Sequence, residues 1–292
     1  MKNYIIAIDA SVDVEEKYIR ENEIVIIPMK YILNEEEYVM EQRLNEDEMH
    51  AFYNAMRAGG ITHTSQITPY YYQEVFRREA DKGNDILYIA LSGGLSNTCS
   101  SARTAADEIM DEYEDLHIEV VDSLAGTGGM GLILMEAIRA KNSGVSLETN
   151  ASNLRNIAGK VCHWFLVDDL VYLRRGGRIS AATAIAGSML NIKPILKIQD
   201  DGTLTTIAKQ RGLAKASAFL TDCYAHAYST DLPQDVIVAH ADVEDSARKL
   251  KEQILSINPQ AAVQICSLSP IIGAHTGPGM MAVIHWGDRN YR

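Results

Sequence analysis

Hydroxyl-bearing residues collect where a buried segment turns into a helix. The apolar run Ile86–Leu91 is followed by two glycines and then by Ser96 and Asn97, which open a helix-like stretch. A helix start has unpaired N–H groups and the positive end of the helix dipole, so it favours an anion. Gly94 would let the backbone approach a ligand, and Ser96 could bond a carboxylate or phosphate or simply cap the helix.

A second corner repeats this chemistry. Thr64 and Ser65 precede a helical pattern that has Pro69 near its start, a position that proline prefers. Taken alone, such a loop is an ordinary capped helix start. Two hydroxyl-rich helix starts in one short stretch of chain favour a shared anion pocket.

Two enzymatic alternatives arise from the same part of the chain. Gly94 and Ser96 match half of the G-x-S-x-G elbow of serine hydrolases, but the second glycine is missing. Gly126–Gly131 matches the G-x-G-x-x-G pattern of dinucleotide sites. That pattern follows a late strand, and Glu148, at the distance expected for the acidic partner, has no strand before it. A hydrolase with Ser96 as nucleophile and a Rossmann-like nucleotide-dependent enzyme both stay open.

Positive charge gathers at one glycine turn of an acidic chain. Arg174, Arg175 and Arg178 surround Gly176-Gly177, and arginine side chains suit carboxylates and phosphates. A solvated turn paired with nearby aspartates is the ordinary alternative.

A histidine lies between small residues near the end of the chain. His275 and Thr276 belong to the stretch Gly273–Gly279, whose glycines would let the backbone come close to a ligand. A lone histidine is usually structural, but in this setting His275 is a candidate hydrogen-bond donor.

Composition narrows the class of ligand and the compartment. The chain has 292 residues, 47% hydrophobic and 23% charged, with a formal net charge of −12, which disfavours nucleic acid as the main ligand. No apolar run is long enough to span a membrane and the start does not resemble a signal peptide, so a cytoplasmic protein is expected. The four cysteines are far apart and predict neither a zinc site nor a disulfide framework.

Predicted strands alternate with helix-length stretches, which is typical of a parallel sheet covered by helices. In the first half we expect strands at 4–9, 24–29, 85–91 and 117–122 and helices at 69–82, 99–114 and 129–142. In the second half we expect strands at 161–167, 196–198, 203–208, 236–241 and 262–267, helices at 212–228 and 242–257, and a hairpin at Asp200-Asp201-Gly202. The fold class is α/β, with an α/β domain over residues 1–156 and an α+β domain over 157–292.

Six motifs occur along the chain in a fixed order. They are Thr64-Ser65-Gln66, Leu91–Thr98, Val121-Asp122-Ser123, Tyr172–Ser180, Leu190–Leu196 and His275–Gly279. This ordered set resembles the DegV family of bacterial fatty-acid-binding proteins, which includes the acyl-carrying subunits of fatty acid kinase. The resemblance implies a two-domain fold with a long-chain fatty acid threaded between the domains.

The resemblance also implies roles for single residues. The carboxylate of the fatty acid would meet the hydroxyls of Thr64 and Ser96, with Arg174 and His275 nearby. The remaining ligand-binding residues are expected in the same motifs: Ser65, Gly94, Asn97 and Thr276.

In the kinase systems a separate ATP-binding subunit phosphorylates that carboxylate. This chain would then be a lipid-binding carrier and not an enzyme, with the fatty acid as ligand and no cofactor or metal. Arg175 and Arg178 are expected to contact the kinase partner. The chain has no G-x-x-x-x-G-K-[ST] phosphate loop.

Energetics favour a lipid over a small polar metabolite. Burying a tail contributes roughly 0.8 kcal/mol per methylene, so ~15 methylenes give on the order of 12 kcal/mol before ordering costs. A buried carboxylate is costly unless it is hydrogen-bonded, which explains hydroxyls at two helix starts. Candidates for the apolar wall are Ile61, Leu95, Met130, Ile185, Met189 and Ile192.

Overall fold

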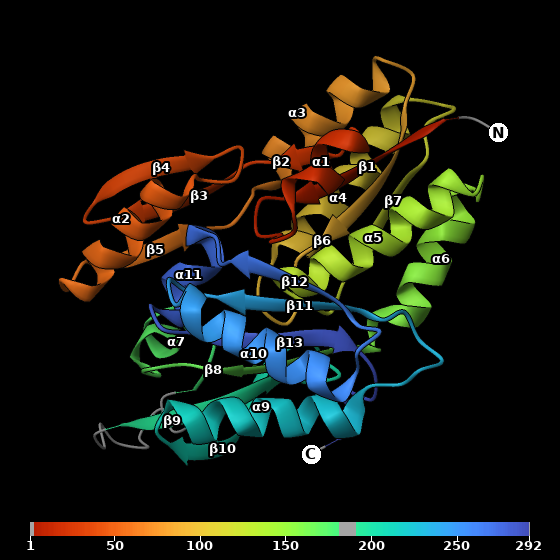
Figure 1. The fold of residues 1–292 in the computed structure, drawn as a ribbon. Helices are drawn as coiled ribbons and strands as arrows, with labels where there is room; N and C mark the ends of the chain where they lie inside the picture. Colours follow the sequence, from red (N-terminus) through yellow and green to blue (C-terminus); the bar gives the residue numbers. More distant parts are fainter. Residues whose placement is uncertain (1–2, 181–190, 292) are drawn as a thin grey trace.

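A four-stranded parallel sheet lies in the first half of the chain (Figure 1). The computed structural model describes residues 3–180 and 191–291. The order of this sheet is β2 (Val25–Ile27), β1 (Tyr4–Asp9), β6 (Asp85–Ala90) and β7 (Ile118–Asp122), and each neighbouring pair is parallel. β1 and β6 are almost wholly buried, which is typical of parallel strands that are covered on both faces. The predicted parallel sheet is confirmed.

Helices cover this sheet in two pairs. α3 (Pro69–Ala80) packs beside α4 (Thr98–Glu112), and α5 (Gly128–Asn142) packs beside α6 (Leu147–Ala158), while α1 (Glu16–Glu21) is a short surface helix. α5 also contacts strands of the second sheet, so it lies between the two halves of the molecule. Every residue in its first two turns is therefore buried.

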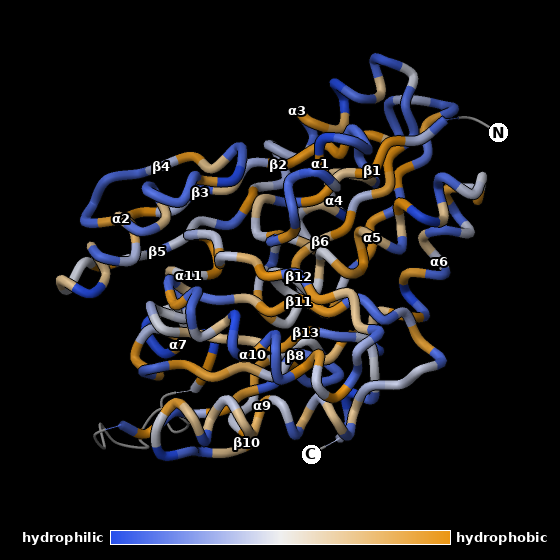
Figure 2. Tube along the Cα trace, viewed as in Figure 1, coloured by the Kyte–Doolittle hydropathy of each residue, from blue (hydrophilic) through white to orange (hydrophobic). Residues whose placement is uncertain are grey.

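The second half of the chain forms a six-stranded mixed sheet. Within this sheet, β11 and β12 are the one parallel pair among the described strands. The order is β10 (Leu204–Arg211), β9 (Ile192–Ile198), β8 (Val161–Leu166), β13 (Met281–Trp286), β11 (Asp235–His240) and β12 (Ala262–Ser267). α9 (Leu213–Ala227) and α10 (Glu244–Ile257) pack on this sheet and on each other. Figure 2 shows hydrophobic residues along β11 and β12, as the burial of β11 requires. The predicted hairpin joins β9 to β10.

A small third sheet was not predicted. It consists of β4 (Glu36–Met40), β3 (Met29–Leu33) and β5 (Thr62–Ser65) in antiparallel pairing, and α2 (Glu46–Arg57) follows β4 in the chain. The prediction of a single strand at 24–29 is wrong. Pro28 separates β2 from β3, and these two strands belong to different sheets. Proline has no N–H to give to a ladder, so it commonly marks such a division.

The end of the chain returns to this third sheet. α11 (Pro270–Thr276) packs against β3, β5 and α2, and Thr62 of β5 donates a hydrogen bond to the carbonyl of Ala274 at 3.0 Å. The expected boundary near residue 157 lies in the last turn of α6, and β8 begins at Val161. Two domains are present, while the exact division into 1–156 and 157–292 stays a prediction. Segments from both lie around the cavity described next.

Candidate functional site

A narrow cavity lies where the first sheet, the third sheet and the second sheet meet. About 780 Å³ there is free of protein atoms, its opening to solvent included, but the centre of a water molecule reaches only about 80 Å³ of it. Most of the free space therefore lies within one water radius of protein atoms, as expected for a narrow cavity. Most of its lining is apolar: Met29, Leu91, Leu95, Phe165, Leu173, Ile198, Leu204, Ile271, Ile272, Met280, Ala282 and Ile284.

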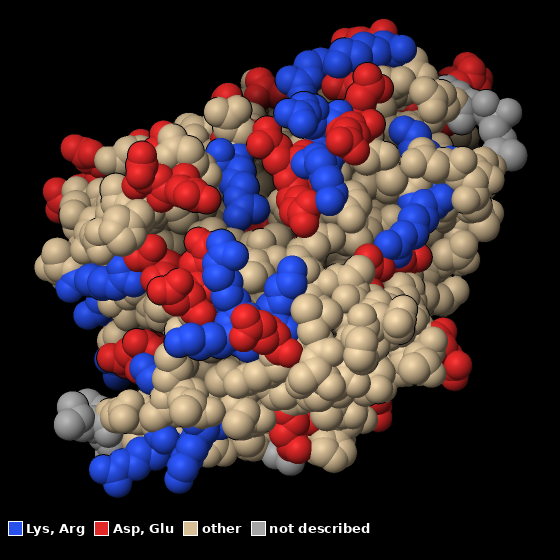
Figure 3. Space-filling view, in the orientation of Figure 1, with Lys and Arg blue, Asp and Glu red and all other residues tan. Residues whose placement is uncertain are grey.

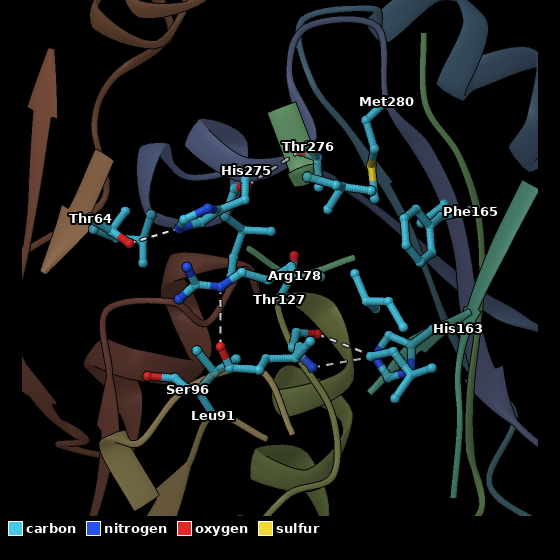
Figure 4. Close-up of a pocket in the computed structure, with 18 of the residues that line it drawn as sticks. Thr64, Leu91, Ser96, Thr127, His163, Phe165, Arg178, His275, Thr276 and Met280 are labelled. Carbon is cyan, nitrogen blue, oxygen red and sulfur yellow. Dashed lines mark hydrogen bonds between the residues drawn. The ribbon is translucent and has the colours of Figure 1, made fainter. Parts of the chain in front are cut away.

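Polar groups from four distant segments meet at one side of the cavity (Figure 4). Thr64 and Ser65 come from β5, Ser96 from the turn after β6, Arg178 from the turn after α7 (Val171–Arg175), and His275 from α11. We call these five residues the polar rim. The hydroxyl oxygen of Thr64 lies 2.7 Å from Nε2 of His275, and Nε of Arg178 donates to the carbonyl of Leu95 at 3.2 Å.

Electrostatics make Arg178 the positive group of the rim. Burial, and then the charge of Arg178 and nearby His63, lower the pKa of His275 to about 3, so its ring is neutral at physiological pH. Arg178 is half-buried and lines the cavity, and burial lowers its pKa. A neutral ring with one N–H beside a guanidinium and three hydroxyls is a set of hydrogen-bond donors suited to a carboxylate.

The Gly-Gly turn is required by the position of His275. A Cβ atom at Gly176 would lie 2.2 Å from Nδ1 of His275, so only glycine leaves room for the ring. The Gly176 carbonyl in turn accepts a hydrogen bond from Nη1 of Arg178. The arginine cluster and the histidine motif, far apart in sequence, therefore form one structural unit.

Known proteins match the chain over nearly its full length. The family model described as "Uncharacterised protein, DegV family" matches residues 4–286, and a DegV domain-containing protein of Clostridium perfringens is 33% identical over 288 residues, 99% of each chain. The chain belongs to the DegV family. A solved structure of DegV from Bacillus subtilis, described as a fatty acid binding protein, is 28% identical with a TM-score of 0.83 and covers 98% of this chain and 100% of that one. A Thermotoga maritima structure described as revealing fatty acid binding function is 25% identical, with the same TM-score of 0.83 and the same coverage.

Not every predicted site residue of this DegV chain lies at the cavity. Thr64, Ser65, Ser96, His275 and Thr276 line it, as expected. The lining does not include four others, all of them exposed: Gly94, Asn97, Arg174 and Arg175.

Geometry favours an exchange of roles among the arginines. We expected Arg174 at the head group and Arg178 at a partner surface, but Arg178 lines the cavity and Arg174 points to solvent. Gly94 serves packing, because a Cβ there would lie 2.5 Å from the backbone of Gly202 in the β9–β10 hairpin. Asn97 is the N-cap residue of α4, but its side chain forms no capping hydrogen bond.

The wall candidates had a mixed outcome. Leu95 lines the cavity, whereas Ile61, which is 56% exposed, and Met130, which is buried in the core, lie outside the lining. Ile192 is half-buried in β9 and also outside the lining. Ile185 and Met189 lie outside the described residues.

In the glycine pattern at 126–131, Gly126 lines the cavity, whereas the glycines of α5 are explained by packing against protein. A Cβ at Gly129 would lie 2.1 Å from Nε2 of His163, and one at Gly128 would lie 2.6 Å from the side chain of Ile237. The second sheet thus occupies the space in which a dinucleotide would need to approach. Ser96 has no histidine partner among the described contacts; its hydroxyl pairs with that of Thr98. Neither enzymatic alternative is favoured.

Sequence reasoning missed Thr127 and His163, which also line the cavity. His163 is a polar residue in the otherwise apolar strand β8, and burial lowers its pKa to about 3. Thr127 has φ 48° and ψ −126°, an unusual conformation for a β-branched residue that costs on the order of 1–3 kcal/mol. A histidine inside an apolar strand was the available signal for His163. Thr127 lies inside the Gly126–Gly131 pattern, which pointed to a nucleotide and not to an apolar cavity.

Proposed function

We propose that this DegV chain binds a long-chain fatty acid in the cavity, with the carboxylate at the polar rim. The observation that carries the proposal is a narrow apolar slot with hydroxyls, a neutral histidine and a guanidinium gathered at one side. The relatives described as fatty acid binding proteins in Bacillus subtilis and Thermotoga maritima support it.

Four of the five rim residues have a distinct part in holding the carboxylate. Arg178 supplies the positive charge that a buried anion needs, and it is held in place through the carbonyls of Leu95 and Gly176. Thr64 and His275 are paired and share one hydrogen between them, which leaves the pair a further donor for the ligand. Ser96 provides a hydroxyl near the amino end of α4, where an anion is favoured.

The apolar lining accounts for the tail. Phe165 and Met280 lie across the cavity from Thr64 in Figure 4, so a tail that starts at the rim would extend toward them. A bent or flat polar ligand would leave this apolar surface in contact with water, whereas a hydrocarbon chain removes it from water. The length and unsaturation of the fatty acid are properties to be measured.

The carrier role is the finer part of the proposal. A separate ATP-binding kinase subunit would phosphorylate the bound carboxylate, and exposed Arg174 and Arg175 on α7 would contact that subunit. The chain by itself would then consume no ATP. On the face in Figure 3, acidic and basic side chains are interspersed over α1, α2 and α10, which supports the expectation that nucleic acid is not the ligand. A cytoplasmic location stays a prediction; none of the described helices has the length and apolar character to cross a membrane.

Two measurements test the function. The purified chain is extracted with organic solvent and the extract is analysed by mass spectrometry, and the delipidated protein is titrated with a fluorescent fatty acid. We expect a co-purified fatty acid and saturable binding at one site. Bound nucleotide would support the Rossmann-like alternative, acylation of Ser96 would support the hydrolase, and the absence of saturable binding would overturn the proposal.

A further inference from the structure

A buried carboxyl group bridges two parts of the cavity that are far apart in sequence. Asp13, in the loop after β1, is 2% exposed. Its Oδ2 accepts a hydrogen bond from the hydroxyl of Thr127 at 2.5 Å, and its Oδ1 accepts one from the backbone N–H of Ser269 at 3.0 Å. Thr127 lines the cavity, and Ser269 precedes α11, so the two oxygens of one side chain hold two different walls.

Thr127 needs such a restraint. Its φ of 48° lies in a region that β-branched residues rarely adopt. Thr127 is the residue directly before α5. The carbonyl oxygen of the adjacent Gly126 lies 3.2 Å from Nε2 of His163. The position of Thr127 therefore also influences the position of His163 at the cavity. His163 lies across the cavity from Thr64 in Figure 4, on the side away from the polar rim.

Ser269 fixes the start of the helix that carries the rim histidine. The carbonyl of Ser269 accepts the N–H of Gly273 at 2.7 Å, which makes it the first acceptor of α11. His275 follows within the same short helix and pairs with Thr64. A shift of Ser269 would therefore move α11 and, with it, the rim residue His275.

The surroundings of Asp13 support an ordered, charged bridge. Arg43 donates hydrogen bonds to the carbonyls of Val14 and Ser267, both 3.2 Å away, and its charge favours the ionised form of Asp13. Burial acts in the opposite direction and dominates, so the pKa of Asp13 is raised to about 6.

We infer that Asp13 is a positioning residue for fatty acid recognition. It holds the strained Thr127 wall and the start of α11 at a fixed separation, so that the cavity can discriminate between acyl chains of different length. This inference rests on the proposed function, because the acyl chain is its ligand.

The test measures discrimination as well as affinity. Lauric, myristic, palmitic and stearic acids displace a fluorescent fatty acid from the wild type, Asp13→Asn and the matched control Asp235→Asn, whose carboxyl is also largely buried but pairs with Arg139. With its Oδ1 on the Ser269 N–H, an asparagine can only donate its Nδ2–H to the Thr127 hydroxyl, and this neutral bond is weaker than the bond to a carboxylate. The ratio between the tightest and the weakest acid should therefore fall by about tenfold, a change of one decade in Kd. Asp235→Asn should keep the wild-type ratio.

Variants of Thr127 separate positioning from general destabilisation. Thr127→Gly removes both the hydroxyl and the backbone strain, so it should fold at least as well as Asp13→Asn and show the same loss of discrimination. Thr127→Ser keeps the hydroxyl and should restore the wild-type profile. If Asp13→Asn and Thr127→Gly keep the wild-type ratios among the four acids, the inference is wrong. If the wild type binds none of the acids, the proposed function itself fails.

Discussion

Two neighbouring corners of the first sheet have similar sequences, but their glycines have different surroundings. β6 leads through residues 91–97 into α4, and β7 leads through residues 123–127 into α5, with glycines at both corners. At the first corner Leu95 and Ser96 line the cavity while Gly93 is exposed. At the second corner Gly126 and Thr127 also line the cavity, but the space beside the next two glycines, Gly128 and Gly129 of α5, is filled by Ile237 and His163. A glycine-rich corner after a strand thus predicts that something approaches closely, but not whether ligand or protein does so.

At the first corner the largest effect is expected from Arg178, which donates a hydrogen bond to the carbonyl of Leu95. Arg178→Met should weaken fatty acid binding by about 2–5 kcal/mol, because the carboxylate would be buried without its positive partner. Titration with a fluorescent fatty acid measures the loss. Arg174→Met is the matched control, and it should bind like the wild type because Arg174 is exposed outside the lining. The reverse ranking would restore the roles expected from sequence.

The hydroxyls at the rim should have the next largest effect. Ser96→Ala and Thr64→Val each remove one hydrogen bond to a buried charge, so each should weaken binding by ~1.5–3 kcal/mol. The control is Ser100→Ala, an exposed serine on α4 outside the cavity lining. Wild-type affinity in both rim variants would place the carboxylate elsewhere.

The second corner should respond through stability instead. Gly129→Ala places a methyl group against His163 and should lower the free energy of unfolding by about 1–3 kcal/mol, as overpacking does. Gly93→Ala is the comparison variant: its Cβ would meet only the side chain of Asp122, at 2.7 Å, so a smaller loss is expected. Urea denaturation measures both. Equal losses would remove the difference between the two corners.

Features that depend on local sequence patterns could be predicted from the sequence. Strand-to-helix alternation located the parallel sheet, and hydroxyls beside helix starts located Thr64 and Ser96 at the cavity. It did not predict the third sheet, because β4 is a largely exposed strand whose residues lack the alternating pattern. It also could not rank the arginines, because which of them faces the cavity depends on α11, whose His275 packs against the turn from nearly 100 residues away.

The smallest expected effect concerns the exposed arginines. Arg174→Ala and Arg175→Ala should leave fatty acid binding unchanged, because neither residue lines the cavity. If they contact an acidic surface of a kinase subunit, each should weaken that association by about 0.2–1 kcal/mol at low ionic strength, as exposed ion pairs do. The difference in association free energy between wild type and variant should shrink as salt is added, because salt screens the charge attraction that only the wild type makes. The measurement is the affinity for a cognate kinase subunit at several salt concentrations. The control is Lys249→Ala, an exposed position on α10. Losses in the arginine variants that match those of the control would show that α7 is an ordinary solvated helix and that the partner binds elsewhere.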